Sequence, residues 1–233
     1  MLDYTSQQSE NGFRDTGLYR SLNGWYRNGG KRTLDIAGAS AGLILTFPIM
    51  GLAAAGIKVE GWLNPEYRRS VFYEAERIGR GGSPFTMYKF QSMRNGAKGE
   101  EREMLQANGA PSPDARYIDE DSDPRITPWG RILRRTKVDE LPNLWNILTG
   151  DISISGNRPP SPEEHEHRVE AMGEEKANRL VEWPGLTGPA QTYGGRRISD
   201  RQRRRIEALY EPDLLNDFGS IVRTPFAVLR EMV

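Results

Sequence analysis

The feature that most constrains the fold of this chain is a run of 22 residues, Ile36 to Ile57, without one ionisable side chain. Its length reaches the roughly 20 residues that an α-helix needs to cross a bilayer. Lys31 and Arg32 precede the run and Lys58 follows it. The mean hydropathy of the whole chain, −0.67, is that of a soluble protein. If the protein binds a membrane, this one segment must carry the attachment.

Three structures compete for this segment: a buried core helix, a straight transmembrane span and a bent hairpin that enters and leaves on one side. Pro48 lies just past the middle, where it removes a backbone donor and clashes with the preceding turn. Positive charge at both ends selects no orientation by the positive-inside rule, and is easier to satisfy if both ends stay cytoplasmic. We therefore predict a re-entrant membrane helix over residues 31–60, broken at Pro48, and the straight span remains the alternative.

The remaining residues predict one small catalytic domain of mixed α/β class, with amphipathic helices lying on the membrane. Residues 1–30 read as a polar N-terminal arm, loosely ordered, with a short interfacial helix as an option, and residues 61–233 form the domain. Alternation and glycine punctuation predict short strands at Ser70–Phe72 and Phe85–Phe90. A helix and loop are expected over 95–123, helices over 142–148, 161–180, 200–210 and 213–233, and a glycine-rich loop over 184–195.

Composition excludes several functional classes. Thirty-two basic residues balance thirty-two acidic ones, so no net field draws the molecule onto nucleic acid. The basic cluster from Arg201 to Arg205 is expected to face anionic lipid headgroups instead. The absence of cysteine excludes a disulfide framework, a thiolate zinc site and a cysteine nucleophile. The first thirty residues show no secretory signal pattern.

The densest chemistry lies around the adjacent carboxylates Asp139 and Glu140. If Pro142 begins a helix, this pair sits just before its N-terminus, where backbone amides and the helix dipole favour anions. Aspartate is a known nucleophile toward phosphoryl groups, and Mg²⁺ bound by Asp139 and Glu140 would offset their repulsion. Five arginines that could hold phosphate oxygens bracket the pair: Arg125, Arg131, Arg134, Arg135 and Arg158.

A series of short motifs occurs in the order and spacing of one family. The motifs are K-R-x-x-D at 31–35, E-R-I-G at 76–79, Y-K-F-x-S-M at 88–93, D-P-R-I-T at 123–127, L-R-R-T-x-x-D-E-L-P at 133–142, G-D-x-S at 150–153, R-P at 158–159 and P-G-L-T-G-x-A-Q at 184–191. In these motifs the chain resembles the bacterial sugar transferases, the monotopic phosphoglycosyl transferases, from Lys31 to its C-terminus.

The resemblance implies transfer of a sugar 1-phosphate from a UDP-sugar to polyprenyl (undecaprenyl) phosphate at the cytoplasmic face of the bacterial inner membrane, with release of UMP. It makes Asp139 the nucleophile that forms a covalent sugar-phosphate intermediate, and Glu140 its metal-assisting partner with Mg²⁺. Arg134 and Arg158 match positions that handle phosphate. The loop containing Thr187, Gly188 and Gln191 matches a region that lines the nucleotide and sugar.

Some questions stay open at this level. The sugar, the pathway and the choice between a monomer and a homodimer do not follow from the sequence. Asn157 stands where the family has proline, which we expect to loosen the turn beside Arg158. Two other classes compete with the enzyme: a membrane-tethered scaffold without catalysis, and a soluble regulator that binds nucleotide sugars. Intact Asp139 and Glu140 disfavour the first, and the apolar run disfavours the second.

Overall fold

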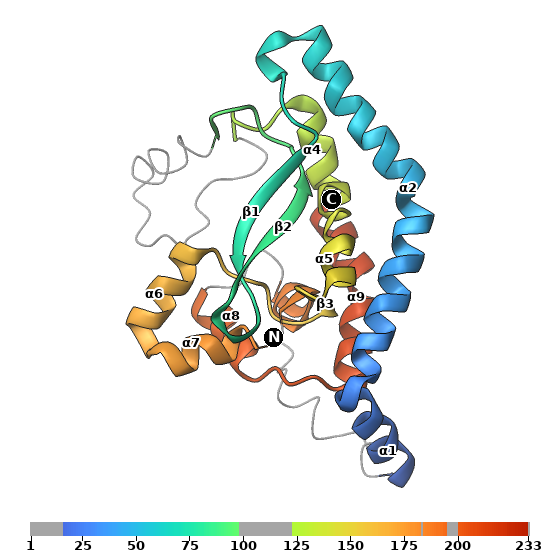
Figure 1. The fold of residues 1–233 in the computed structure, drawn as a ribbon, viewed down its shortest axis with the longest axis vertical. Helices are drawn as coiled ribbons and strands as arrows, with labels where there is room; N and C mark the ends of the chain where they lie inside the picture. Colours follow the sequence, from blue (N-terminus) through green and yellow to red (C-terminus); the bar gives the residue numbers. More distant parts are fainter. Residues whose placement is uncertain (1–15, 98–122, 183, 195–199, 233) are drawn as a thin grey trace.

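The computed structural model describes residues 16–97, 123–182, 184–194 and 200–232 (Figure 1). The predictions for residues 1–15 and for most of 95–123 lie outside these ranges. The described helices and strands are α1 (Gly17–Trp25), α2 (Lys31–Leu63), β1 (Phe72–Ile78), β2 (Pro84–Phe90), α4 (Pro128–Arg135), α5 (Asn143–Thr149), β3 (Ser153–Ser155), α6 (Pro162–Met172), α7 (Glu174–Leu180), β4 (Gly185–Thr187), α8 (Asp200–Ala208) and α9 (Leu214–Met232).

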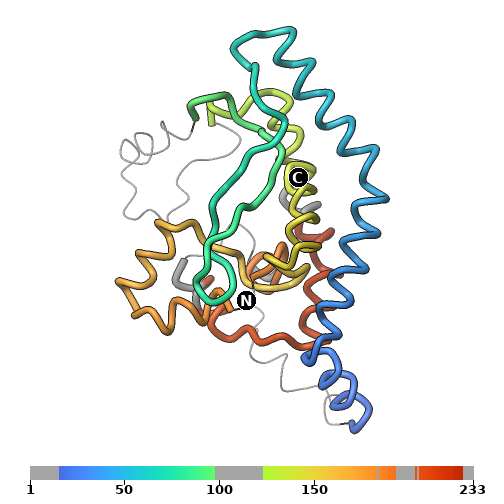
Figure 2. The backbone as a smooth tube through the Cα atoms, viewed as in Figure 1, coloured from blue at the N-terminus to red at the C-terminus, as the bar shows by residue number. Residues whose placement is uncertain are grey.

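Helix α2 runs along one edge of the molecule and packs on it through small residues (Figures 1 and 2). Ala39 and Ala53 are fully buried. A Cβ atom added at Gly56 would lie 2.2 Å from the ring of Trp129, so the close approach of helix and domain requires glycine there. The close packing of α2 on the domain explains why this long apolar segment is rich in alanine and glycine.

Two apolar cores lie against α2, one on each side of Pro48. Ala39 belongs to the first core, which also contains residues of β1, β2 and α5 and Ile152 just before β3. Ala53 and Ile57 belong to the second, together with Phe90 of β2 and Leu133 of α4. Both halves of the helix are therefore attached to the same domain.

The outer face of α2 is apolar and exposed. Ile44, Leu45 and Phe47 each expose about three quarters of their surface (75%, 74% and 74%). Among the described residues, one helical segment, Gly17–Leu63, is long and apolar enough to cross a membrane by length and composition. Because little of its most apolar stretch is buried, the alternative of an ordinary core helix is disfavoured.

The bend predicted at Pro48 is not seen as a break between two arms. Helix α2 continues from Lys31 through Pro48 to Leu63. The hydroxyl of Thr46 donates to the carbonyl of Gly42 at 2.7 Å, a contact that bends helices slightly. The re-entrant hairpin therefore remains a prediction.

Strands β1 and β2 form an antiparallel hairpin with Phe72 opposite Phe90. The strand predicted at Phe85–Phe90 is confirmed, but the one predicted at Ser70–Phe72 was wrong, since β1 begins at Phe72 and continues to Ile78. The strand pattern of β1 was not recognised in the sequence because the strand contains the charged residues Glu74, Glu76 and Arg77. One face of this two-stranded sheet is open to solvent, so charged residues are tolerated in the strand.

The helical predictions for the C-terminal half are largely confirmed. Helix α5 ends at Gly150, whose φ of 94° requires glycine. The single helix predicted over 161–180 is two, because Gly173 has a φ of 86° and separates α6 from α7. The loop predicted over 184–195 contains β4, which pairs in parallel with β3. The predicted helices over 200–210 and 213–233 correspond to α8 and α9.

The charged residues at the start of α2 are clamps between the helix and the domain. Asp35 accepts hydrogen bonds from the Ser153 hydroxyl at 2.7 Å and the Ile154 amide at 2.9 Å. Arg32 donates to the carbonyls of Ile147 and Leu148 at the end of α5. These bonds give the K-R-x-x-D motif a structural role.

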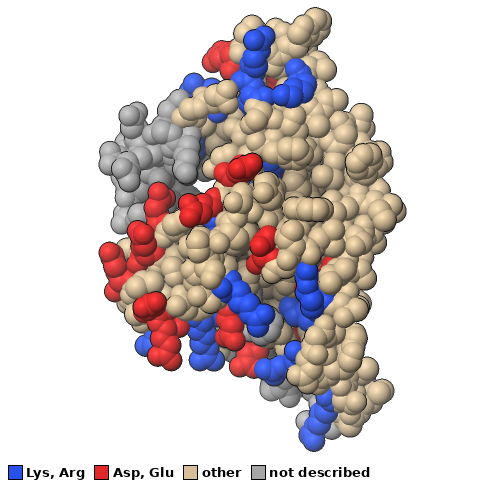
Figure 3. All heavy atoms as spheres, in the orientation of Figure 1, with Lys and Arg blue, Asp and Glu red and all other residues tan. Residues whose placement is uncertain are grey.

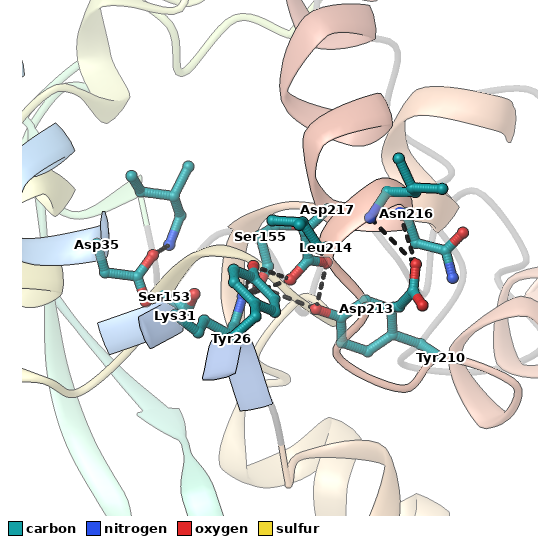
Figure 4. A network of polar contacts seen from close by, with 12 residues as sticks. Tyr26, Lys31, Asp35, Ser153, Ser155, Tyr210, Asp213, Leu214, Asn216 and Asp217 are labelled. Carbon is teal, nitrogen blue, oxygen red and sulfur yellow. Dashed lines mark hydrogen bonds and ion pairs between the residues drawn. The ribbon is translucent and has the colours of Figure 1, made fainter. Parts of the chain in front are cut away.

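Lys31 belongs to a buried polar network centred on Asp217 of α9 (Figure 4). The Asp217 carboxylate accepts from Tyr26 at 2.5 Å, Lys31 at 2.7 Å, Tyr210 at 2.7 Å and Ser155 at 2.9 Å. Removing one partner of such a buried pair leaves an uncompensated charge, which typically costs about 3–5 kcal/mol. The network fastens the start of α2, strand β3 and helix α9 to one another.

Candidate active site

Asp139 and Glu140 lie in a short 3₁₀ turn, Val138–Glu140, between α4 and α5. The turn follows Lys137, whose φ of 58° is the only positive value at a non-glycine position among the described residues. Such a conformation is uncommon for lysine and often occurs at functional sites. Helix α5 begins at Asn143, one residue later than predicted, so the carboxylates precede it in a turn of their own.

Lys89 of β2 forms an ion pair with Glu140. The distance from Lys89 Nζ to Glu140 Oε1 is 2.9 Å. The sequence placed Lys89 in the Y-K-F-x-S-M motif without giving it a role. The hairpin brings it to the carboxylates across 51 residues of chain, which no local pattern could reveal.

The two carboxylates have different electrostatic environments. Burial and the neighbouring charge of Glu140 raise the pKa of Asp139 to about 6, against the opposing effects of Lys89, Arg134 and Lys137. Burial would also raise the pKa of Glu140, but the contact with Lys89, with help from Lys137 and Arg158, lowers it to about 2. Glu140 is therefore the permanently charged member, and Asp139 gains its charge near neutral pH.

One oxygen of Asp139 is available for chemistry. Asp139 is buried, with 8% of its surface exposed, and its Oδ1 atom has no hydrogen-bond partner. A buried carboxylate oxygen without a donor is unfavourable unless a ligand, ion or water completes it. Asp139 thus has an unpaired acceptor oxygen, as a nucleophile or a metal ligand requires.

Arg134, at the end of α4, lies beside the carboxylate pair Asp139 and Glu140, which we call the dyad. Its Nε donates to the Ser92 hydroxyl at 2.8 Å, and its charge lowers the pKa of Asp139. Helix α4 reaches this position because Gly130 lies against the Ser92 carbonyl, where an added Cβ would be only 1.9 Å away. The hydroxyl of Thr127 caps the helix by accepting from the Gly130 amide at 3.0 Å.

Arg158 approaches the dyad from the segment that follows β3. It lowers the pKa of Glu140. Its NH1 atom lies 3.3 Å from Oε1 of Glu164, which also closes a capping box with Ser161 at the start of α6. The pKa of Glu164 is about 2 because Arg158, the Ser161 amide and Arg77 outweigh its burial. Glu164 therefore holds Arg158 at the site as a permanent counter-charge.

Arg125 is one of the five arginines predicted to surround the dyad, but its contacts are elsewhere. It is buried in a two-pronged pair with Asp123, with distances of 2.7–3.2 Å, and its NH1 donates to the Ala97 carbonyl at 3.2 Å. Its donors are directed at Asp123 and the Ala97 carbonyl. The prediction failed because adjacency in sequence said nothing of the direction of the side chain.

The expectation that Asn157 loosens the turn beside Arg158 was wrong. Its side-chain amide donates to the carbonyls of Leu180 at 3.0 Å and Glu207 at 2.9 Å. Its own carbonyl accepts from the Gly185 amide at 2.8 Å. Asn157 ties the turn to α7, α8 and β4 and so stiffens the support of Arg158.

The three predicted nucleotide-loop residues lie next to this turn. Thr187 ends β4, and its hydroxyl is 2.7 Å from that of Thr224. An added Cβ at Gly188 would lie 2.0 Å from the Gly156 carbonyl, so only glycine fits. The buried Oε1 of Gln191 has no hydrogen-bond partner. Their contact with a nucleotide or sugar stays a prediction.

Within the described ranges, no three histidine or acidic side chains are grouped to bind a metal ion. The dyad alone supplies two carboxylates, one with an open oxygen on Asp139 and one already paired with Lys89. Mg²⁺ commonly binds through one or two carboxylates, several waters and substrate phosphates. The residues present fit that mode of binding.

Lys89, Arg134 and Arg158 lie around the two carboxylates and can bind phosphate groups, while Asp139 presents an oxygen to one of them. This arrangement is typical of enzymes that transfer phosphate-linked groups. The chain belongs to the bacterial sugar transferase family, whose profile matches residues 26–231. The resemblance drawn from the motifs is thereby confirmed.

Curated relatives agree with this assignment. The chain is 36% identical over 173 residues to the galactosyl transferase CpsE of Streptococcus agalactiae, covering 73% of this chain and 35% of the relative. It is 33% identical over 207 residues to the undecaprenyl-phosphate galactose phosphotransferase of Salmonella typhimurium (86% and 40%) and 33% over 203 residues to the exopolysaccharide production protein ExoY of Rhizobium meliloti (84% and 81%). The chain thus spans less than half the length of the first two relatives.

Proposed function

We propose that this protein transfers a sugar 1-phosphate from a UDP-sugar to undecaprenyl or a related polyprenyl phosphate, releasing UMP. The observation that carries the proposal is the buried Asp139, with one oxygen unpartnered and a pKa near neutrality, beside the paired Glu140 and Lys89. The names of the Salmonella relative and of a Caulobacter vibrioides glucose-1-phosphate transferase, 35% identical over 181 residues, support the substrate classes.

The proposed reaction has two displacements. An Asp139 carboxylate oxygen attacks the phosphorus that carries the sugar, the bond from that phosphorus to the oxygen of the nucleotide phosphate breaks, and UMP leaves. The polyprenyl phosphate oxygen then attacks the same phosphorus. The Asp139–phosphorus bond breaks, the carboxylate is restored and a polyprenyl diphosphate sugar is released.

The cations around the dyad would bind the substrate and neutralise its charge. Arg134 precedes the dyad in the sequence and Arg158 follows it. Each can offer a planar pair of donors to phosphate oxygens. Lys89 holds Glu140 ionised. Mg²⁺, held by Asp139, Glu140 and substrate phosphates, would supply additional charge neutralisation for the leaving nucleotide.

A panel of UDP-sugars, each incubated with the protein, Mg²⁺ and polyprenyl phosphate, tests the function through released UMP. A productive donor would identify the sugar. Nucleotide-sugar binding without UMP release under all these conditions would favour the scaffold or the regulator.

The acid limb of the pH–rate profile, where the rate falls as pH falls, tests the difference in pKa between Asp139 and Glu140. Because Asp139 must be ionised to attack, the single-turnover rate should fall at acid pH, and bound Mg²⁺ would place that fall below the metal-free pKa of about 6. Lys89→Met removes a charge that lowers the pKa of Asp139, so the limb should move up by about one pH unit. Glu140→Gln removes a charge that raises it, so the limb should move down. Lys176→Met, on an exposed position of α7, is the control. Limbs that coincide in all variants would contradict the assignment.

We also propose that α2 anchors the protein at the cytoplasmic face of the inner membrane and enters and leaves the bilayer on the same side, so that both ends face the cytoplasm. Contacts at each end of the helix support this. Lys31 is 2.7 Å from Asp217 of α9. Glu60 is 2.7 Å from Arg69 and accepts from the Trp129 amide at 2.8 Å. A straight span would place these two polar attachments on opposite sides of the bilayer.

Labelling of single cysteines tests this topology in a chain that has none of its own. Asn28→Cys and Glu66→Cys occupy exposed positions flanking α2. Both should react with a membrane-impermeant maleimide only when the cytoplasmic side is accessible. Reaction of the two from opposite sides would establish a straight span and overturn the proposal.

A further inference from the structure

Helix α1 precedes the segment matched by the family profile, which begins at residue 26. Its function is therefore not explained by membership of the family. It is nonetheless fastened to the domain. The Tyr19 hydroxyl donates to Asp213, and the Leu214 amide donates to the side chain of Asn23 at 3.1 Å. These two contacts fix one side of α1 against the start of α9.

A different side of α1 carries exposed apolar side chains. Leu18 is 64% exposed, Leu22 41% and Trp25 53%. At about 100° per residue these three fall within roughly 60° of one another on the helix. Tyr19 and Asn23 are turned about 100° away from them. The polar contacts therefore determine where the apolar stripe points.

The stripe lies next to the proposed membrane anchor. α1 joins α2 through the short segment Tyr26–Gly30, in which Gly29 has a φ of 116° and changes the direction of the chain. Leu34 and Ile36 are exposed at the start of α2. In Figure 3 the uncharged surface along the outer edge of α2 continues toward α1 at the lower end of the molecule. The exposed apolar residues of α1 are thus close in sequence to those at the start of α2, and an uncharged surface extends between the two helices.

We infer that α1 lies in the membrane interface and contacts lipid through Leu18, Leu22 and Trp25. The inference rests on the proposed anchoring of α2. Amphipathic helices bind bilayers in this way, with an aromatic residue at the level of the headgroups and basic residues turned toward water or anionic lipid. Arg20 is exposed on the side of α1 opposite the stripe, and no acidic residue lies within the helix. Lipid fits this composition better than a second protein copy, since the stripe contains only three large side chains.

Spin labels on single cysteines test the inference in the full-length chain, in vesicles of phosphatidylethanolamine and phosphatidylglycerol. Leu22→Cys lies in the stripe. Gly24→Cys is the matched control, because it lies on another side of the helix and an added Cβ there meets no atom within 4 Å. The label at 22 should be accessible to oxygen and shielded from a water-soluble nickel complex. Its accessibility to the nickel complex should be about tenfold lower than that of the label at 24. Leu18→Cys repeats the measurement so that the result does not depend on the loss of Leu22.

A third label separates failure of this inference from failure of the anchor. Phe47→Cys lies on the exposed face of α2, where Phe47 is 74% exposed. A label shielded from nickel at 47 but not at 18 or 22 would overturn the role of α1 alone. Exposure to nickel at all three positions would overturn the membrane anchoring as well. Broadening between labels of two chains at 18 and 22 would make the stripe a dimer contact and overturn lipid binding there.

Discussion

Asp139→Asn should abolish turnover, with a loss of roughly 10⁴-fold or more, as expected when a covalent nucleophile is removed. Asparagine keeps the size of the side chain, and its amide cannot form the acyl phosphate intermediate. Since the Oδ1 atom of Asp139 has no hydrogen-bond partner in the described structure, the substitution removes no hydrogen bond of that atom. Folding should therefore be retained, which thermal unfolding of the variant can check.

The covalent intermediate gives this prediction a direct readout. The unmodified protein, incubated with Mg²⁺ and donor but no lipid acceptor, should gain the mass of one sugar phosphate, and peptide mapping should place it on Asp139. The Asp139→Asn protein should gain nothing. Glu140→Gln should still bind donor but form the adduct much more slowly. If no adduct appears and Asp139→Asn still turns over, the acceptor phosphate attacks directly and Asp139 only binds metal.

Arg158→Ala should lower kcat/KM by about 10²- to 10³-fold, the usual cost of losing one donor that stabilises transition-state charge. Arg158→Lys should recover only part of the loss, because an ammonium group cannot reproduce the planar pair of donors. The reason for singling out this arginine is its position between Glu164 and the dyad, with an effect on the pKa of Glu140. Measurements of UMP release against donor concentration provide kcat and KM separately.

Arg205→Ala is the matched control, because Arg205 is exposed on α8 and belongs to the basic cluster noted in the sequence. It should leave kcat/KM nearly unchanged. A second comparison uses Glu164→Gln. Glutamine can replace glutamate in the capping box, so α6 should survive while Arg158 loses its counter-charge. Small and equal losses for Arg158→Ala and Arg205→Ala would show that the phosphate site lies elsewhere.

The pairing of Lys89 with Glu140 illustrates what sequence reasoning missed. Lys89 was visible in a family motif, but nothing in its own strand marks it as the partner of Glu140, which lies 51 residues away in the sequence. The same limit applies to Arg125. It was grouped with the dyad because it is close in sequence, but it forms an ion pair with Asp123. Ion pairs between distant residues depend on the direction of side chains, which neighbours in sequence do not specify.

Much of the architecture followed from local rules. The apolar run required a helix, although not the break predicted at Pro48, glycine ended α5, and the spacing of the motifs identified the family, because these signals depend on neighbouring residues and on backbone geometry. The adjacency of Asp139 and Glu140 was likewise explicit in the chain.

Only the tertiary structure decided what separates the two carboxylates and what holds α2. The pKa of Asp139 near 6 and that of Glu140 near 2 arise from burial and from cations contributed by β2, α4 and the turn after β3. Lys31 and Asp217 meet across 186 residues. Charge interactions act through space and grow as water is excluded, so their strength was determined when the elements packed together.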